Sequence, residues 1–100
     1  MAERIFADRA ALAALCRHHH IRSLSLFGSH LKGTARQDSD VDLLVEFETG
    51  WIPGLLGLAG IEVEISALLG GRRVDLRTAQ DLSPHFRSEI VSTAEIQYAA

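Results

Sequence analysis

The sequence has few of the residues that mark secreted or membrane-spanning proteins. Cys16 is its only cysteine, which excludes an intrachain disulfide framework and a cysteine-based zinc site and favours a reducing compartment. No apolar run approaches the roughly 20 residues that a membrane-spanning helix needs. The first residues lead into a polar, alanine-rich stretch without the apolar segment of a secretion signal, so we expect a cytoplasmic protein.

Basic residues are also scarce. The chain has 10 lysines and arginines against 13 acidic residues, which gives a formal net charge of −3 at pH 7. Affinity for a nucleic-acid backbone depends on basic side chains that neutralise its phosphates, so direct nucleic-acid binding is not expected. The composition, 47% hydrophobic and 23% charged, is typical of one globular domain spanning residues 1–100. At this length we expect one modest core and no separate substrate-recognition domain.

Hydrophobic periodicity and helix-capping residues predict the secondary structure. Helices are predicted at residues 8–20, 55–69 and 84–98, with a short helical segment within 28–33. Strands are predicted at 21–27, 41–47 and 72–77. Asp8 is the predicted N-cap of the first helix, and the last helix has an apolar stripe of Phe86, Ile90 and Ala94. This order favours an α/β (α+β) fold with a small three-stranded sheet flanked by helices. It does not indicate the order or direction of the strands.

Gly28 and Ser29 lie where a strand is predicted to meet a helical turn. A glycine at such a junction lets the backbone bend and lets a ligand approach closely. The exposed N–H groups of the following turn suit an anion, and a serine hydroxyl adds one more donor for a phosphate oxygen. The pair therefore indicates a phosphate-binding site, although two such residues also occur in ordinary turns.

Asp40 and Asp42 are two residues apart at the start of a predicted strand. Side chains at this spacing point the same way and lie roughly 6.5–7 Å apart along the strand. Two such carboxylates can reach a pair of divalent cations about 3.5–4 Å apart, and Mg²⁺ suits them because substrate oxygens and water complete its coordination. Asp75, between the apolar residues of a later strand, would add a third carboxylate if that strand is adjacent. Otherwise Asp75 is a surface residue paired with an arginine, Arg73 or Arg77.

Other readings of these residues are less consistent with the sequence. Residues 28–34 carry the two glycines of a Walker A loop, but Thr34 stands where that motif requires lysine. The aspartates at 38–42 resemble the start of an EF-hand loop, but Leu43 replaces its glycine. The three consecutive histidines at 18–20 point in different directions on a helix, so we expect a solvated helix end there. Trp51 is equally consistent with a core residue and with an exposed apolar patch.

The motif residues resemble those of the polymerase-β nucleotidyltransferase superfamily. Gly28-Ser29, ten intervening residues and Asp40-x-Asp42 match the superfamily pattern of a glycine-serine pair followed by two aspartates. The short chain resembles the minimal nucleotidyltransferase (MNT) branch, and the likeness continues through Asp75 into the last predicted helix. It implies the polymerase-β palm-like fold, a small mixed β-sheet flanked by helices.

This resemblance also implies a role for each residue. Gly28 and Ser29 would bind the triphosphate of ATP, and Asp40 and Asp42 would bind two Mg²⁺ ions. Asp75 would bind the catalytic metal and help to deprotonate the attacking hydroxyl. Relatives often carry an arginine directly after the glycine-serine pair, where this sequence has His30, and Lys32 is a candidate to supply that charge.

Minimal members of the superfamily act as antitoxins of helical HEPN ribonucleases. The resemblance therefore implies a protein adenylyltransferase that transfers AMP from ATP to a tyrosine of a HEPN toxin and forms a hetero-oligomer with it. Two alternatives stay open. The chain could neutralise the toxin by binding alone, with an inactive acidic site, or it could transfer the nucleotide to a small molecule such as an aminoglycoside.

Overall fold

The computed structural model describes residues 5–28 and 40–100 and contains a four-stranded sheet. Along the chain the elements are α1 (Arg9–His18), β1 (Ile21–Phe27), β2 (Val41–Phe47), α2 (Leu55–Leu68), β3 (Val74–Arg77), the short 3₁₀ helix η1 (Ala79–Asp81), α3 (Pro84–Thr93) and β4 (Glu95–Ala99). The strand order is β3-β2-β1-β4. The sheet is mixed, because β1 pairs antiparallel with both β2 and β4 while β2 pairs parallel with β3.

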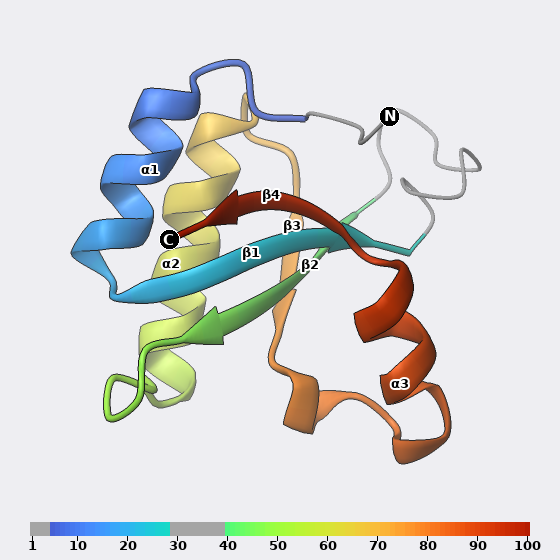
Figure 1. Ribbon diagram of the computed structural model, residues 1–100. Helices are drawn as coiled ribbons and strands as arrows, with labels where there is room; N and C mark the ends of the chain where they lie inside the picture. The colour runs from blue at the N-terminus through green and yellow to red at the C-terminus, as the bar shows by residue number, and fades with distance from the viewer. Residues whose placement is uncertain (1–4, 29–39) are drawn as a thin grey trace.

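Helices α1 and α2 lie side by side on one face of the sheet, whereas α3 lies apart from them next to η1 (Figure 1). The core fills the layer between the sheet and these two helices. Its fully buried side chains come from both layers. They include Leu12, Cys16, Leu24, Leu26, Leu43 and Ile65. One face of the sheet is therefore committed to packing, and the other is available for a site.

The elements near the site form for reasons that are visible in the sequence. The Asp8 side chain caps α1 by accepting a hydrogen bond from the backbone N–H of Ala11 at 2.9 Å. In β2, Val41, Leu43 and the two following odd-numbered residues are buried, while the even-numbered residues are more exposed. This alternation places Asp42 on the face opposite the core. The predicted strands at 21–27 and 41–47 are confirmed with the same bounds.

The prediction of one helix over residues 84–98 is wrong. Helix α3 begins at Pro84, with Ser83 as its N-cap, but ends at Thr93, and residues 95–99 form the edge strand β4. The sheet consequently has four strands rather than three. The apolar stripe predicted for this helix is not a buried stripe, since α3 has no buried residue and Phe86 is 58% exposed.

Within residues 5–28 and 40–100, none of the helices combines the length and the apolar character that crossing a membrane requires. The longest of them, α2, has 14 residues.

Candidate active site

Asp42 and Asp75 come together on the open face of the sheet. The parallel register of β2 and β3 pairs Asp42 with Asp75, and the residues on either side of each aspartate are buried on the core face. Paired residues of neighbouring strands project from the same face, so the two carboxylates belong to one site. The sequence left the adjacency of these strands open. The structure brings Asp75 beside Asp42.

The backbone of Gly28 lies directly against the Asp42 carboxylate. Asp42 pairs with Phe27 at the end of β1, and Gly28 follows with a φ of +81°. A Cβ atom built on Gly28 would lie only 2.2 Å from Oδ2 of Asp42. Only glycine avoids both this collision and the strain of a left-handed backbone. Gly28 is thus part of the carboxylate site as well as a turn residue.

Two arginines lie close to the carboxylates of Asp40 and Asp75. Nε of Arg73 is 3.9 Å from Oδ1 of Asp40, and Nε of Arg77 is 3.1 Å from Oδ2 of Asp75. Both pairs are largely exposed to solvent, so each contributes little to stability. Asp75 therefore pairs with Arg77, as the sequence allowed, and also lies beside Asp42 in the sheet.

The donor chemistry of this site fits Mg²⁺. Among residues 5–28 and 40–100, no three acidic, histidine or cysteine side chains lie close enough together to hold one ion. Mg²⁺ does not require such a cage, because it commonly binds one or two carboxylates and takes its other ligands from substrate phosphates and water. The Asp42–Asp75 pair supplies that number of carboxylates, and the Asp42 carboxylate lies where a side chain at position 28 would begin.

Several residues named from the sequence lie outside the described part of the chain. These are Ser29, His30 and Lys32, together with the predicted helical segment that follows Gly28. Their roles in phosphate binding stay predictions.

The histidines at the end of α1 have structural contacts. Nε2 of His19 is 2.8 Å from Oε2 of Glu64, and the ring of His20 stacks on Trp51 with their centroids 3.6 Å apart. Trp51 is 55% exposed, so it belongs to the surface and not to the core. Within the part of the chain that the structure describes, these histidines form no metal site.

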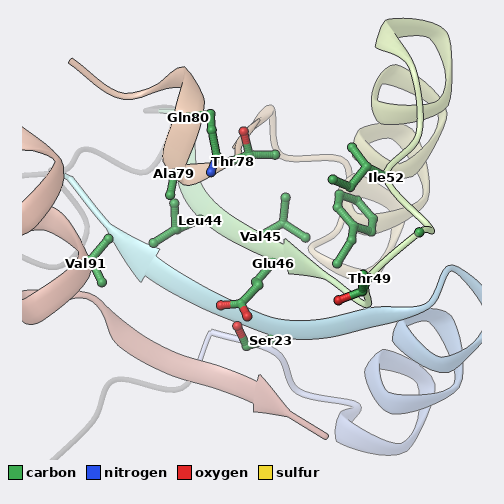
Figure 2. A pocket seen from close by; sticks show the side chains of 12 residues that line it. Ser23, Leu44, Val45, Glu46, Thr49, Ile52, Thr78, Ala79, Gln80 and Val91 are labelled. Carbon is green, nitrogen blue, oxygen red and sulfur yellow. The ribbon is translucent and has the colours of Figure 1, made fainter. Parts of the chain in front are cut away.

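A groove of about 410 Å³ begins at Leu44, two residues after Asp42 on β2, and was not predicted from the sequence. Its floor is the second half of β2, and its sides include Ser23 of β1, η1 and Val91 of α3 (Figure 2). The alternation in β2 leaves Leu44 and Glu46 on the open face of the sheet. It gave no indication that η1 and α3 would form a side of the groove there.

Comparison with known proteins identifies the family of this chain. Residues 9–96 match the nucleotidyltransferase domain family. The chain belongs to the nucleotidyltransferase family. The match extends from the first residue of α1 into β4 and includes Asp40 just before β2, Asp42 on β2 and Asp75 on β3.

Individual relatives agree with this assignment. The chain is 50% identical to the protein adenylyltransferase MntA of Thermococcus cleftensis over 56 residues, which are 56% of this chain and about half (54%) of that protein. It shares 40% identity and a TM-score of 0.67 with a structure described as a putative minimal nucleotidyltransferase, covering 86% of this chain and 85% of the other. The expected resemblance to the minimal nucleotidyltransferases is confirmed.

A toxin–antitoxin structure determined with AMP-PNP has the same fold. Its TM-score is 0.71 over 93% of this chain and 74% of that chain, at 19% sequence identity. At this identity the likeness concerns the fold alone. The fold predicted from the resemblance, a small mixed sheet flanked by helices, is confirmed as well.

Proposed function

We propose that this chain is a single minimal nucleotidyltransferase domain that acts as a cytoplasmic antitoxin. It transfers AMP from ATP to a tyrosine of a HEPN-domain toxin. The observation that carries this proposal is the register of Asp42 beside Asp75, with the Gly28 backbone against the Asp42 carboxylate. The membership in the nucleotidyltransferase family and the identity to a protein named adenylyltransferase support it.

Each residue has a defined task in the proposed reaction. Gly28 and Ser29 bind the triphosphate, and Asp40, Asp42 and Asp75 hold two Mg²⁺ ions, which supply positive charge that stabilises the transition state. The tyrosine oxygen forms a bond to the α-phosphorus, the bond from that phosphorus to the bridging oxygen breaks, and pyrophosphate leaves. Asp75 accepts the hydroxyl proton. Catalysis then depends mainly on positioning and charge neutralisation, as is general for phosphoryl transfer.

The partner in this proposal is a toxin with which the antitoxin forms a hetero-oligomer. The fold of this chain is also found in a toxin–antitoxin structure, which supports the proposal that this fold can bind such a partner. The net charge of −3 also suits contact with the basic RNA-binding surface of a ribonuclease. That charge is equally consistent with the alternative in which the chain neutralises the toxin by binding alone.

Transfer of labelled AMP from ATP to a HEPN-domain toxin tests the proposal. We expect the wild-type chain to label the toxin and Asp42→Asn to reduce the rate about a thousandfold or more, because a ligand of the metal is lost. Asp8→Asn is the matched control, since asparagine caps a helix as well as aspartate and Asp8 lies outside the site. Labelling that survives in Asp42→Asn would contradict the proposal.

The same variant separates catalysis from binding alone in cells. If catalysis neutralises the toxin, Asp42→Asn no longer protects cells that express it, although the variant still folds. Full protection by this variant would support the binding-only alternative. Labelling of aminoglycosides in place of the toxin would identify a small-molecule acceptor.

A further inference from the structure

We infer that the groove beside β2 binds an extended segment of the acceptor protein and directs its tyrosine hydroxyl toward Asp42 and Asp75. This inference rests on the proposed function and adds to it the place where the acceptor docks. The groove has a volume of about 410 Å³. Figure 2 shows Leu44 and Val91 at one end and Thr49 and Ile52 at the other.

The groove begins within reach of the carboxylates. Leu44 follows Asp42 by two residues on the same strand and the same face, so their backbones are about 7 Å apart. A tyrosine side chain is long enough to bridge this distance. A residue held in the groove beside Leu44 can therefore bring its hydroxyl to the site while its backbone stays in the groove.

The direction of attack also favours the acceptor in this groove. In a displacement at phosphorus, the attacking and leaving oxygens lie roughly in line on opposite sides. Gly28, the proposed triphosphate end, lies against Asp42 near the beginning of β2, and the groove extends along the end of the same strand. If pyrophosphate leaves on the Gly28 side, the hydroxyl approaches from the Leu44 side.

The edge of β2 along the groove suits an extended peptide. Strand β3 pairs with β2 only from Val41 to Leu44, so in the described part of the chain no strand continues this pairing beside residues 45–47. Val45 and Phe47 line the groove at this edge. An extended peptide can lie in the groove between this edge and η1 and place alternate side chains in it.

The opposite side of the groove is held by hydrogen bonds between η1 and α3. Nε of Arg87 in α3 donates to the carbonyl oxygen of Ala79 at 2.7 Å, and Nη2 donates to the carbonyl oxygens of Gln80 and Leu82. These bonds fix Ala79 and Gln80 opposite β2. The groove is therefore a feature of connected elements and not a gap beside one loop.

An apolar surface beyond the groove indicates that the occupant is a protein. Ile52, which lines the outer end, is 74% exposed, and the neighbouring side chains of Trp51, Leu55 and Leu56 are also exposed. Large apolar side chains that are exposed close together along one segment favour protein–protein contact. A nucleotide confined to the groove would leave this surface uncovered, whereas an acceptor protein would cover both.

Arginine substitutions on the groove test this inference with the HEPN-domain toxin of the labelling experiment. Val91→Arg and Ile52→Arg place a large cation in the groove from exposed positions, so both variants are expected to fold. We expect each to weaken the complex, measured by calorimetry, and to raise the KM for the toxin about tenfold while the Kd for ATP stays unchanged. Val63→Arg is the matched control, because Val63 is an exposed helical valine outside the groove.

The outcomes separate this inference from the proposed function. A wild-type chain that binds the toxin through the groove but transfers no AMP would contradict the proposed function only. Wild-type affinity and KM in both groove variants would overturn the inference, and so would an increased Kd for ATP, which would assign the groove to the nucleotide. A wild-type chain that neither binds nor labels the toxin would overturn both.

Discussion

At the scale of single residues, Gly28 determines the shape of the carboxylate site. Its positive φ and its contact with Asp42 are two separate reasons for glycine, and the sequence indicated only the first. A glycine-serine pair after a strand predicts a bend and a ligand-accessible backbone. The partner of that backbone, a carboxylate on the next strand, depends on strand pairing and could not be predicted from local sequence.

Replacing Gly28 separates the two effects. Gly28→Ala adds a methyl group against Oδ2 of Asp42 and places alanine in a left-handed conformation, which costs roughly 1–2 kcal/mol by itself. Gly70→Ala is the control, because Gly70 also has a positive φ but open space around it. We expect chemical denaturation to show a larger loss for Gly28→Ala and transfer activity to fall only in that variant. Equal losses of stability, with activity retained, would contradict a role for the contact with Asp42.

Asp81 provides a pH-dependent test at the same scale. Hydrogen bonds from the backbone N–H of Thr78 at 3.1 Å and from its hydroxyl at 3.0 Å lower the pKa of Asp81 below 3.8. The stabilising effect is therefore present above pH 3.8 and is lost as the pH falls through the lowered pKa. NMR titration of Thr78→Val is expected to show a partial return of this pKa toward 3.8, because only the hydroxyl is removed. An unchanged pKa would contradict the assigned cause.

At the scale of elements, the chain after α3 shows the limit of prediction from local sequence. Residues 84–98 contain no glycine, and their only proline is at the first position, so nothing within them marks the end of a helix. The strand forms because β1 offers an edge for pairing, and because its backbone and Gln97 make contacts across the fold. Arg9 donates to the carbonyl oxygen of Gln97 at 2.7 Å, and the side chain of Gln97 accepts from the backbone N–H of Ile5 at 3.3 Å. These contacts are distant in sequence.

A variant that ends at Ala94 tests whether β4 is integral to the sheet. The removal of β4 leaves one edge of β1 unpaired and uncovers Leu24, which pairs with Tyr98 of β4. We expect the free energy of unfolding, measured by chemical denaturation, to fall by several kcal/mol or the chain to fail to fold, since such losses follow from opening a core. A small change, as expected for shortening an exposed helix end, would contradict the four-stranded sheet.

At the scale of the whole molecule, the site depends on one crossover connection. Helix α2 joins β2 to β3, and parallel pairing through such a connection brings Asp75 beside Asp42 although 32 residues separate them along the chain. The sequence identified the acidic residues and their positions in the strands. It predicted a shared site only if the two strands are neighbours. The structure meets that condition, which the residues alone did not determine because strand order depends on packing of the whole chain.

The groove is a property of the whole molecule in the same sense. It is formed by elements from β1 to α3, and each contributes only one to a few side chains. No single segment carries a motif for it. The exposed apolar residues Ile52 and Val91 are far apart in the sequence, and only the fold places them at the two ends of one groove.

We propose that Asp42 and Asp75 hold a divalent cation beside Gly28. Anomalous diffraction from crystals grown with Mn²⁺ and a non-hydrolysable ATP analogue tests it most directly, because Mn²⁺ favours the same oxygen ligands as Mg²⁺. We expect an ion between the carboxylates of Asp42 and Asp75, with the triphosphate toward Gly28 and the groove beside Leu44 left open for the acceptor. An ion bound elsewhere, or an analogue whose phosphates lie in the groove, would contradict the account.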